Sequence, residues 1–315
     1  MPEAYYTEGT LFGTEENREY IGSIEGIERA MREGRILEGI ATRAGGTHTL
    51  SVELGEYMGV IEKDEVQLTH GEAVKDIAVI TRVGKPVCFK VTSVERRRVG
   101  APIITLSRRA AQLDCAENYL AALRAGDVIP AKVTHLEHFG AFVDIGCGIV
   151  SLLSIDCMSV SRISHPGDRL AVGGELRVAV RAIDRNENGL PTRIYVTGRE
   201  LLGTWEENAA LFSVGQTVTG IVRSVEPYGI FVELTPNLAG LAEYRDDVTV
   251  GQCVSVYIKN IIPERMKIKL VIIDAMRSLK PSVRTGIVHA DTAHIDRWRY
   301  SPEVCERVVE TVFCE

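Results

Sequence analysis

The chain has 315 residues, enough for two or three ordinary domains, and 45% of them are hydrophobic. Its formal net charge of −7 excludes a simple polycation that coats nucleic acid, and no apolar stretch approaches the length of a membrane-spanning helix. The seven cysteines are odd in number and include no Cys-x-x-Cys pair, which indicates free thiols in a reducing compartment, so we expect a cytoplasmic protein.

Residues 1–33 are acidic and are predicted to form an N-terminal helical segment, with one helix over residues 14–33. Thr14 is a suitable N-cap for this helix, and Gly34 marks its end. The helix would present one apolar face, built from residues at spacings of three and four: Ile21, Ile24, Ile27 and Met31.

From Ile36 onward the chain changes to short β-branched runs separated by glycine, which predict strands of about five residues. These runs lie at 52–54, 59–61, 87–91 and 103–106. Two helical stretches are predicted to connect groups of strands, at 108–125 and 199–212, and the segment from Pro302 to Phe313 can form a short helix.

Residues 126–145 and 215–234 are two versions of one segment. Phe139-Gly140-Ala141-Phe142 in the first corresponds to Tyr228-Gly229-Ile230-Phe231 in the second, and a similar start at Gly34 indicates a third, diverged copy. Units of roughly 70 residues with five short strands and no βαβ alternation are typical of small barrels. We therefore predict a mainly β protein of three tandem five-stranded OB-fold barrels, at 34–109, 124–200 and 213–275, followed by a tail at 276–315.

The recurring aromatic pair can be interpreted in two ways. Strict alternation along a strand would place the two rings on opposite faces, and rings in such a motif often belong to the core. The glycine between them permits a bend that brings both rings to the outer surface, where they would form a platform for stacking bases. Because the pair recurs in register in matching units, we favour the stacking platform.

The pattern G-x-x-V-x-x-x-V, followed by F-G-A-F-V, a glycine-rich turn and I-x-x-L, resembles the RNA-binding domain of bacterial ribosomal protein S-one. The resemblance covers residues 124–200 and 213–273 and is weaker over 34–109. The arrangement of three units with a helical lead and a short tail is similar to the short S-one-like proteins of Gram-positive bacteria. The resemblance implies binding of single-stranded RNA (mRNA or rRNA) on the barrel face that carries the aromatics, in translation with the small ribosomal subunit.

Carried over position by position, the resemblance implies nine RNA-binding residues and neither a cofactor nor a metal. In the second unit these are Lys132, Phe139, Phe142, Asp184 and Arg193, and in the third they are Tyr228, Phe231, Lys267 and Lys269. The chain departs from the family at its histidine position, which falls on Ser154 in the second unit and on Glu243 in the third, where a carboxylate would repel phosphate.

The first unit lacks the aromatic pair. The aligned stretch is Thr47-His48-Thr49-Leu50-Ser51, so we do not expect this unit to stack bases, and the resemblance implies that it docks protein instead. The arginines at 96–98 and 108–109 are candidates for contact with the RNA backbone, with a solvated charged loop as the equal alternative.

No catalytic constellation stands out, and we do not expect an enzyme. The histidines at 135 and 138, and the His-Asp cluster at 289–296, have no standard zinc spacing and are expected to be surface polar groups. Two other functions stay open: a protein-interaction adaptor whose aromatics are buried at an interface, and an accessory RNA-binding factor in RNA turnover or transcription. Solvent exposure of the four aromatics on one face distinguishes a stacking surface from a core.

Overall fold

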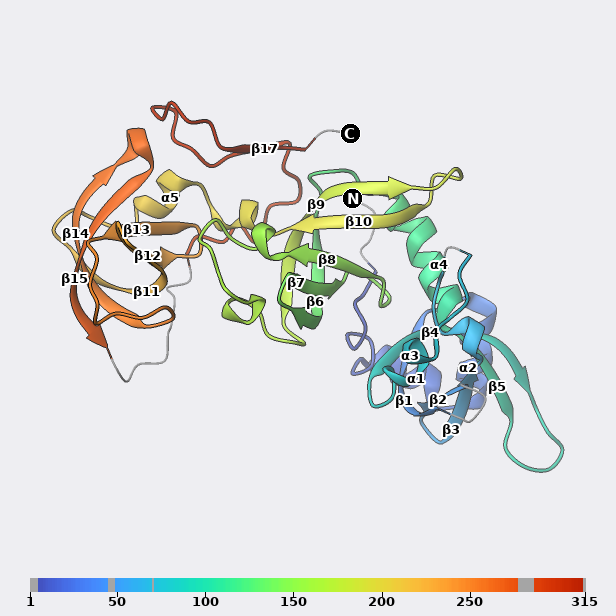
Figure 1. The fold of residues 1–315 in the computed structure, drawn as a ribbon. Coiled ribbons are helices and arrows are strands. Elements are labelled where there is room, and N and C mark those ends of the chain that lie inside the picture. Colours follow the sequence, from blue (N-terminus) through green and yellow to red (C-terminus); the bar gives the residue numbers. More distant parts are fainter. Residues whose placement is uncertain (1–4, 45–48, 70, 277–285, 314–315) are drawn as a thin grey trace.

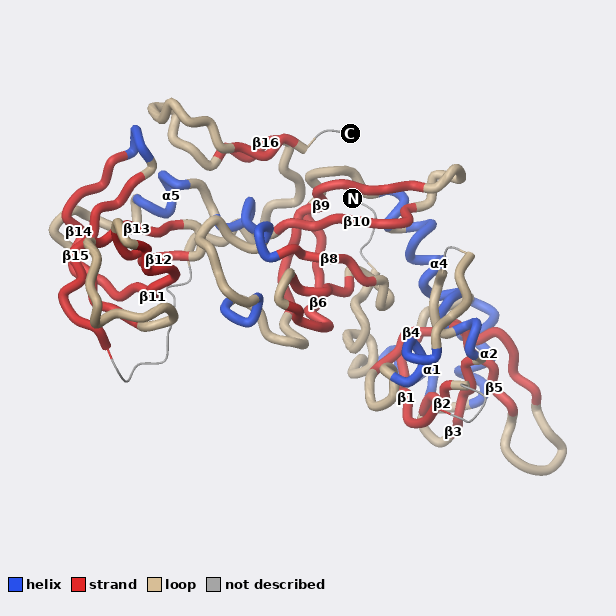
Figure 2. Tube along the Cα trace, in the orientation of Figure 1, coloured by secondary structure: helices blue, strands red, loops and turns tan. Residues whose placement is uncertain are grey.

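Three closed five-stranded barrels follow one another along the chain in the computed structural model, which describes residues 5–44, 49–69, 71–276 and 286–313 (Figure 1). Within each barrel the first strand pairs with the second and fourth, and the third strand pairs with the second and, in parallel, with the fifth. This topology confirms the predicted fold class. The barrels lie in a row with the second in the middle, and Figure 2 shows the strands gathered in three groups with helices beside them.

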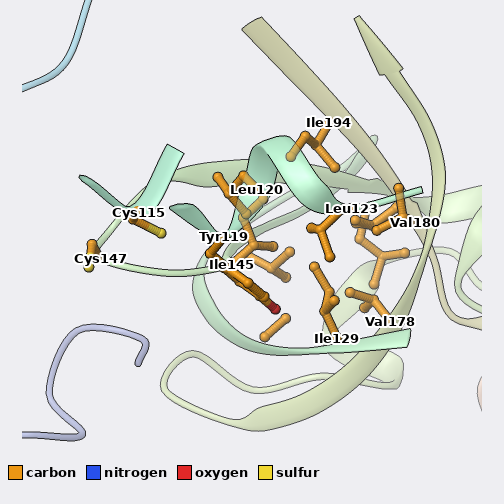
Figure 3. Close-up of a cluster of buried hydrophobic side chains, with 14 of the residues drawn as sticks. Cys115, Tyr119, Leu120, Leu123, Ile129, Ile145, Cys147, Val178, Val180 and Ile194 are labelled. Carbon is orange, nitrogen blue, oxygen red and sulfur yellow. The ribbon is translucent and has the colours of Figure 1, made fainter. Parts of the chain in front are cut away.

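Each barrel is preceded by helical structure that packs into its core. Barrel 1 follows α1 (Glu15–Ile21) and α2 (Ile24–Glu33), barrel 2 follows α4 (Arg108–Asn118), and barrel 3 follows α5 (Trp205–Ala209). A further short helix, α3 (Asp76–Ile80), lies within barrel 1 between its third and fourth strands. Figure 3 shows Cys115 of α4 and the adjoining Tyr119 and Leu120 among the buried side chains of barrel 2. The connecting helices therefore supply apolar surface that covers one end of the following barrel.

The single helix predicted over 14–33 is wrong, because the structure divides this segment into α1 and α2. Thr14 does cap α1, by accepting a hydrogen bond from the Asn17 amide, but α1 ends at Gly22. Ser23 then caps α2 by accepting from the Gly26 amide, so a second set of helix-end amides is satisfied where the chain changes direction. Gly34 ends α2 in the left-handed conformation, at φ 64°.

The strands of the three barrels correspond one to one. Barrel 1 contains β1 (Leu37–Ala44), β2 (Leu50–Leu54), β3 (Tyr57–Ile61), β4 (Pro86–Glu95) and β5 (Ile103–Ser107). Barrel 2 contains β6 (Val128–Glu137), β7 (Gly140–Asp144), β8 (Val150–Ser154), β9 (Glu175–Arg185) and β10 (Pro191–Thr197). Barrel 3 contains β11 (Thr217–Glu226), β12 (Gly229–Thr235), β13 (Leu238–Ala242), β14 (Cys253–Ile262) and β15 (Lys267–Met276).

A register shift at the same place in each barrel allows the three copies to be aligned residue by residue. The pairing of the first two strands shifts after Ala41 in barrel 1, after Val133 in barrel 2 and after Val222 in barrel 3. The next pair after the shift involves Ser51 on the second strand of barrel 1, Phe142 on that of barrel 2 and Phe231 on that of barrel 3. These three residues therefore occupy equivalent positions on the three barrels.

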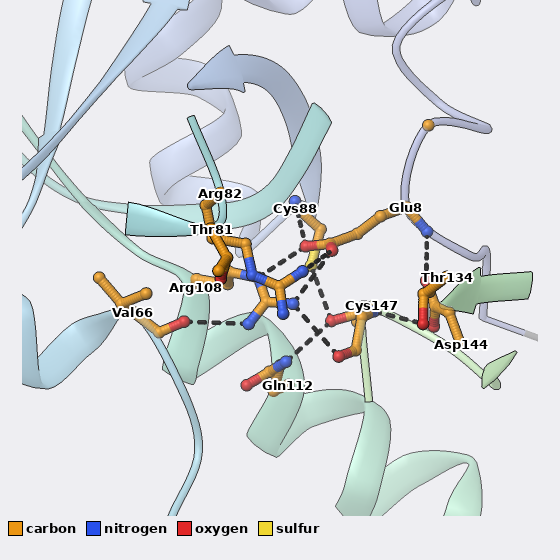
Figure 4. Close-up of polar contacts among 12 residues, drawn as sticks. Glu8, Val66, Thr81, Arg82, Cys88, Arg108, Gln112, Thr134, Asp144 and Cys147 are labelled. Carbon is orange, nitrogen blue, oxygen red and sulfur yellow. Dashed lines mark hydrogen bonds and ion pairs between the residues drawn. The ribbon is translucent and has the colours of Figure 1, made fainter. Parts of the chain in front are cut away.

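The segment before α1 joins barrel 1 to barrel 2 through buried polar contacts (Figure 4). The Glu8 carboxylate accepts from Arg108 Nε at 2.6 Å and from Arg108 Nη2 at 3.0 Å, and it pairs with Arg82 at 3.2 Å. The Glu8 amide donates to Asp144 Oδ2 of β7 at 2.7 Å. Glu8 thus connects Arg108, which follows the last strand of barrel 1, to Asp144 of barrel 2.

The tail joins barrel 2 to barrel 3. Its short strands β16 (Arg297–Arg299) and β17 (Glu310–Val312) pair with each other, so the helix predicted from Pro302 to Phe313 is wrong. The reason is tertiary: Trp298 and Tyr300 are buried in the core of barrel 3, and Phe313 is buried against barrel 2. The Val128 amide of β6 also donates to the Ala293 carbonyl at 2.9 Å.

Within the described parts of the chain, no helix has the length and apolarity needed to cross a membrane.

Candidate nucleic-acid interface

Phe139 and Phe142 lie together on the outer surface of barrel 2. Ala141 and Val143 of β7 point into the core, so Phe142 points outward, where it faces His135 on β6 and Leu152 on β8. Phe139 is 54% exposed, and its ring meets that of Phe142 edge to face with centroids 6.0 Å apart. Neither ring belongs to the core of barrel 2.

Tyr228 and Phe231 repeat this arrangement on barrel 3. Tyr228 is 70% exposed, and its ring meets that of Phe231 edge to face with centroids 6.3 Å apart. Phe231 faces Ser224 on β11 and Leu241 on β13. The register positions and the ring geometry of the two pairs therefore match.

A glycine separates the rings in both pairs because the neighbouring strand passes too close for a side chain. A Cβ added at Gly140 would lie 2.5 Å from the Leu153 carbonyl oxygen, and one added at Gly229 would lie 2.5 Å from the Ala242 carbonyl oxygen. Gly229 also has a φ of 149°. The close approach of the third strand thus requires glycine at this position of both barrels.

The predicted charged residues of barrel 3 lie beside its aromatics. Leu241 of β13 pairs in register with both Phe231 and Lys269, so these three side chains form a row across neighbouring strands. Lys267 lies two residues before Lys269 on the same exposed face of β15. Two ammonium groups are therefore available next to the rings.

Barrel 2 brings Asp184 and Arg193 together, since they are register partners on β9 and β10 and both are exposed. The row equivalent to that of barrel 3 runs from Phe142 through Leu152 to Tyr195, which therefore stands where barrel 3 has Lys269. Tyr195 is not among the RNA-binding residues that the resemblance implies. Alternation along β10 is the signal that could have found it, because Arg193 and Tyr195 are two residues apart and share one face.

Lys132 has a partner in the structure. Its ammonium donates to the Glu8 carbonyl at 3.0 Å, and its register partner is Asp144, the acceptor of the Glu8 amide. The structure therefore places this predicted RNA-binding residue in the junction between barrels 1 and 2, and we do not include it in the interface proposed below.

The positions that depart from the family pattern lie at the same end of the barrels as the exposed rings. Ser154 is half-buried and faces Gly140 in register, and Glu243 is exposed immediately after β13. Neither position offers a cation. The cations identified above, Arg193 on β10 and Lys267 and Lys269 on β15, lie on the fifth strands of barrels 2 and 3.

Barrel 1 has no comparable aromatic row. Ser51 holds the position of Phe142, and Val60 and Thr105 complete the row on the adjoining strands. Thr47 and His48 lie outside the described residues. This row of described residues therefore has no aromatic ring.

The arginines proposed as backbone contacts in barrel 1 are mostly engaged within the protein. Arg108 is 1% exposed and pairs with Glu8, so it fits neither of the two alternatives, an RNA-backbone contact or a solvated charged loop. Arg96 pairs with Glu25 and Glu28, and Arg109 pairs with Glu65.

Three of the histidines considered as metal ligands, His135, His289 and His294, have carboxylate partners, and His138 lies against the His165 ring. His135 Nε2 lies 2.7 Å from Glu137 Oε1, and its ring is nearly parallel to that of Phe142 with centroids 6.4 Å apart. His294 Nδ1 lies 2.7 Å from Asp127 Oδ1, a hydrogen bond that raises the pKa of His294. Among the residues that the structure describes, no group of three or more His, Cys, Asp or Glu side chains is arranged to hold a metal ion.

Comparison with known proteins gives one domain match and several relatives. Residues 122–191, most of barrel 2, match the model of the S1 RNA binding domain. The chain is 34% identical over 119 residues to the small ribosomal subunit protein bS1 of Leuconostoc lactis, an alignment that covers 38% of this chain and 27% of that protein. It is 33% identical over 162 residues to the bS1 homolog of Bacillus subtilis, which covers 50% of this chain and 41% of that protein.

A longer alignment reaches the bS1 protein of Rhizobium meliloti, with 27% identity over 222 residues, 68% of this chain and 36% of that protein. The chain thus spans less than half the length of each of these relatives. Residues 122–191 thus match an S1-type domain, and the chain is similar to bS1 proteins over 38% to 68% of its length.

Proposed function

We propose that barrels 2 and 3 bind single-stranded RNA by stacking bases on their outer aromatic pairs. The observation that carries this proposal is the repetition of one geometry: an exposed ring, a second ring perpendicular to it and a leucine beside the second ring, at equivalent positions. Each stacked base contributes about 1–3 kcal/mol, and stacking accepts most bases because every base has a π-face. The S1 domain match over barrel 2 supports RNA as the ligand.

Phosphate contacts make a small contribution in this proposal. The net charge of the chain is −7, and the cations beside the rings are Arg193, Lys267 and Lys269. Three phosphate contacts would give a slope of about −2 for the logarithm of the association constant against the logarithm of salt concentration. Most of the affinity should therefore persist at salt concentrations that remove purely electrostatic binding.

We place this activity in translation, on mRNA or rRNA at the small ribosomal subunit. The names of the relatives, which are small ribosomal subunit proteins, support this setting. We propose binding without catalysis, because the model that barrel 2 matches is that of an RNA binding domain. Co-sedimentation of the protein with small subunits in cell extracts would test the setting independently of RNA binding.

The stacking proposal predicts the effect of removing one ring from each barrel. We expect Phe142→Ala and Phe231→Ala each to weaken binding of a labelled single-stranded RNA by about 1–3 kcal/mol, or roughly 5- to 150-fold, with a larger loss in the double variant. Fluorescence anisotropy measures the affinities, with a duplex of the same sequence as the reference ligand. Both side chains lie outside the core, so the variants should remain folded.

Ser51→Ala is the matched control, because Ser51 has the equivalent position on barrel 1. It should leave RNA affinity unchanged. Wild-type affinity in a folded double variant would show that the rings do not stack bases. Failure of the wild-type protein to bind RNA at low salt would instead favour the adaptor function, with the exposed rings as a protein contact.

A further inference from the structure

Tyr195 extends the aromatic surface of barrel 2 beyond the pair found in both barrels. It is 38% exposed and lies in the row that begins at Phe142 and continues through Leu152. Neighbouring strands are separated by about 4.8 Å, so Phe142 and Tyr195, two strands apart, are about 10 Å apart across the sheet. This distance suits rings that contact different nucleotides of one extended strand.

The orientation of the Tyr195 ring is set by a hydrogen bond. Its hydroxyl donates to Asp184 Oδ2 at 3.1 Å, and Asp184 is the register partner of Arg193. A tyrosine has few rotatable bonds, so a ring held in this way loses little conformational entropy when a flat ligand stacks on it. The exposed Arg193 guanidinium beside it can contact a phosphate through paired N–H donors.

A cavity of about 560 Å³ begins at this row and continues between barrel 2 and barrel 1. Its lining includes residues of β8 and β10, which pair in register at Leu152 with Tyr195 and at Leu153 with Val196. Phe142, Arg193 and Tyr195 line one side, and Gln67 and Leu68, in the loop after β3, line the other. Its volume falls within the range of small-ligand sites.

The barrel 1 side of this cavity is held in place by hydrogen bonds. The Leu68 amide donates to Gln112 Oε1 of α4 at 2.8 Å, and Gln112 Nε2 donates to the Cys147 carbonyl at 3.1 Å. The loop, the helix and barrel 2 are thus connected, and the cavity is part of the folded junction.

We propose that a second nucleotide of the bound strand stacks on Tyr195 and that the strand continues into this cavity, so that the loop at Gln67 and Leu68 forms part of the RNA path. This inference rests on the function proposed above. A continuing nucleotide is the occupant that fits, because the cavity is continuous with the aromatic row and combines a ring, a guanidinium and the Gln67 amide. The ring can stack on a base, the guanidinium can bind a phosphate, and the amide can form hydrogen bonds with the edge of a base.

Barrel 3 provides an internal contrast. Lys269 replaces Tyr195 at the equivalent position, so that row ends in an ammonium group. Barrel 2 should therefore contact one more base than barrel 3, and the stacking contribution of Tyr195 should be seen only with RNA long enough to reach it.

The test uses the full chain with Phe231→Ala, which weakens binding to barrel 3, and adds Tyr195→Ala, Tyr195→Phe or Phe142→Ala. Affinities are measured for uridine oligonucleotides of about 4 and about 12 residues, lengths that span the site sizes of OB folds. We expect Tyr195→Ala to weaken binding of the longer RNA about 5-fold or more, and Tyr195→Phe, which keeps the ring, to restore most of the affinity. Urea unfolding of each variant reports whether it is folded.

Two results would overturn this inference while leaving the proposed function intact. The first is an affinity of the Tyr195→Ala variant for both RNAs equal to that of its Phe231→Ala parent, with a clear loss in Phe142→Ala. The second comes from photocrosslinking with RNA that contains 4-thiouridine, which tests the barrel 1 side of the cavity. Crosslinks to the peptide that contains Gln67 and Leu68 support the proposed path. Crosslinks confined to barrel 2 contradict it. Unchanged binding in Phe142→Ala as well would mean that the stacking function itself is wrong.

Discussion

At the scale of single residues, Arg108 has an unusual environment for its charge. It is among the largest fully buried side chains of the protein, and besides Glu8 it contacts the carbonyl oxygens of Val66 and Gly148 at 3.0 and 3.2 Å. A buried guanidinium is tolerated only when a partner charge and hydrogen bonds replace water. Glu8, in the N-terminal segment, is that partner charge, so it should govern the stability of the junction.

Glu8→Gln should destabilise the protein by about 3–5 kcal/mol, because it leaves the charge of Arg108 buried without its counter-charge. Urea unfolding followed by circular dichroism measures the free energy. Glu19→Gln is the control: Glu19 pairs with Arg29 but is 66% exposed, and loss of such a pair costs about 1 kcal/mol or less. Equal effects of the two substitutions would contradict a stabilising role for the buried pair.

At the scale of elements, each barrel carries an acidic residue two positions after Ser51, Phe142 or Phe231 on its second strand, but in different environments. Glu53 of β2 is exposed. Asp144 of β7 accepts from the amides of Glu8, Gly146 and Gly148. Glu233 of β12 is fully buried and is held by Arg169 of barrel 2 and Arg223 of its own barrel, at 2.6 Å from each.

Asp144 and Glu233 thus lie at junctions between parts of the fold, whereas Glu53 is exposed. The repeat therefore places a carboxylate at one fixed position of the second strand. The neighbouring elements determine whether this carboxylate forms contacts that join two parts of the fold.

Buried carboxyls at the first junction predict a pH dependence of stability. Burial, followed by the nearby charge of Glu8, raises the pKa of Asp144 to about 6, and burial raises the pKa of Glu38 on β1 to about 7. Because folding raises these pKa values, the two groups stabilise the fold most at a pH below their ordinary values, and this contribution is lost as pH rises through 6 and 7.

We expect Glu38→Gln, which is neutral at every pH, to flatten the decline of unfolding free energy between about pH 5 and about pH 8. Urea titrations across this range provide the measurement. A slope identical to that of the wild-type protein would show that Glu38 does not titrate in this window.

At the scale of the whole molecule, both ends of the chain join neighbouring barrels. The N-terminal segment connects barrels 1 and 2, and the tail connects barrels 2 and 3. Tyr300 also donates from its hydroxyl to the Asn237 carbonyl at 2.6 Å. The aromatic surfaces of barrels 2 and 3 are thereby held in one spatial relation, which would let a single RNA contact both.

Trp298→Ala should release the tail, since it removes a large buried ring from the core of barrel 3 at a cost of about 3–5 kcal/mol. Hydrogen exchange should then accelerate at the Ile295 amide, which donates to the Gly126 carbonyl, and at Val128 of β6, with barrel 1 unaffected. Val304→Ala, at an exposed tail position, should leave exchange unchanged. Unchanged protection in Trp298→Ala would mean that the tail is held by other contacts.

The sequence by itself was sufficient to predict the three barrels and the matching rings at Phe142 and Phe231. Both depend on local signals, namely short β-branched runs, glycine where strands approach closely, and a motif repeated in register. It did not predict the junction of Glu8 with Arg108, the position of Lys132, the pairing of β16 with β17, or the row that ends at Tyr195. Those depend on contacts between residues far apart in the chain, as with Glu8 and Arg108, 100 positions apart. Only the folded barrels bring such side chains together, because packing and the burial of charge are decided by neighbours in space.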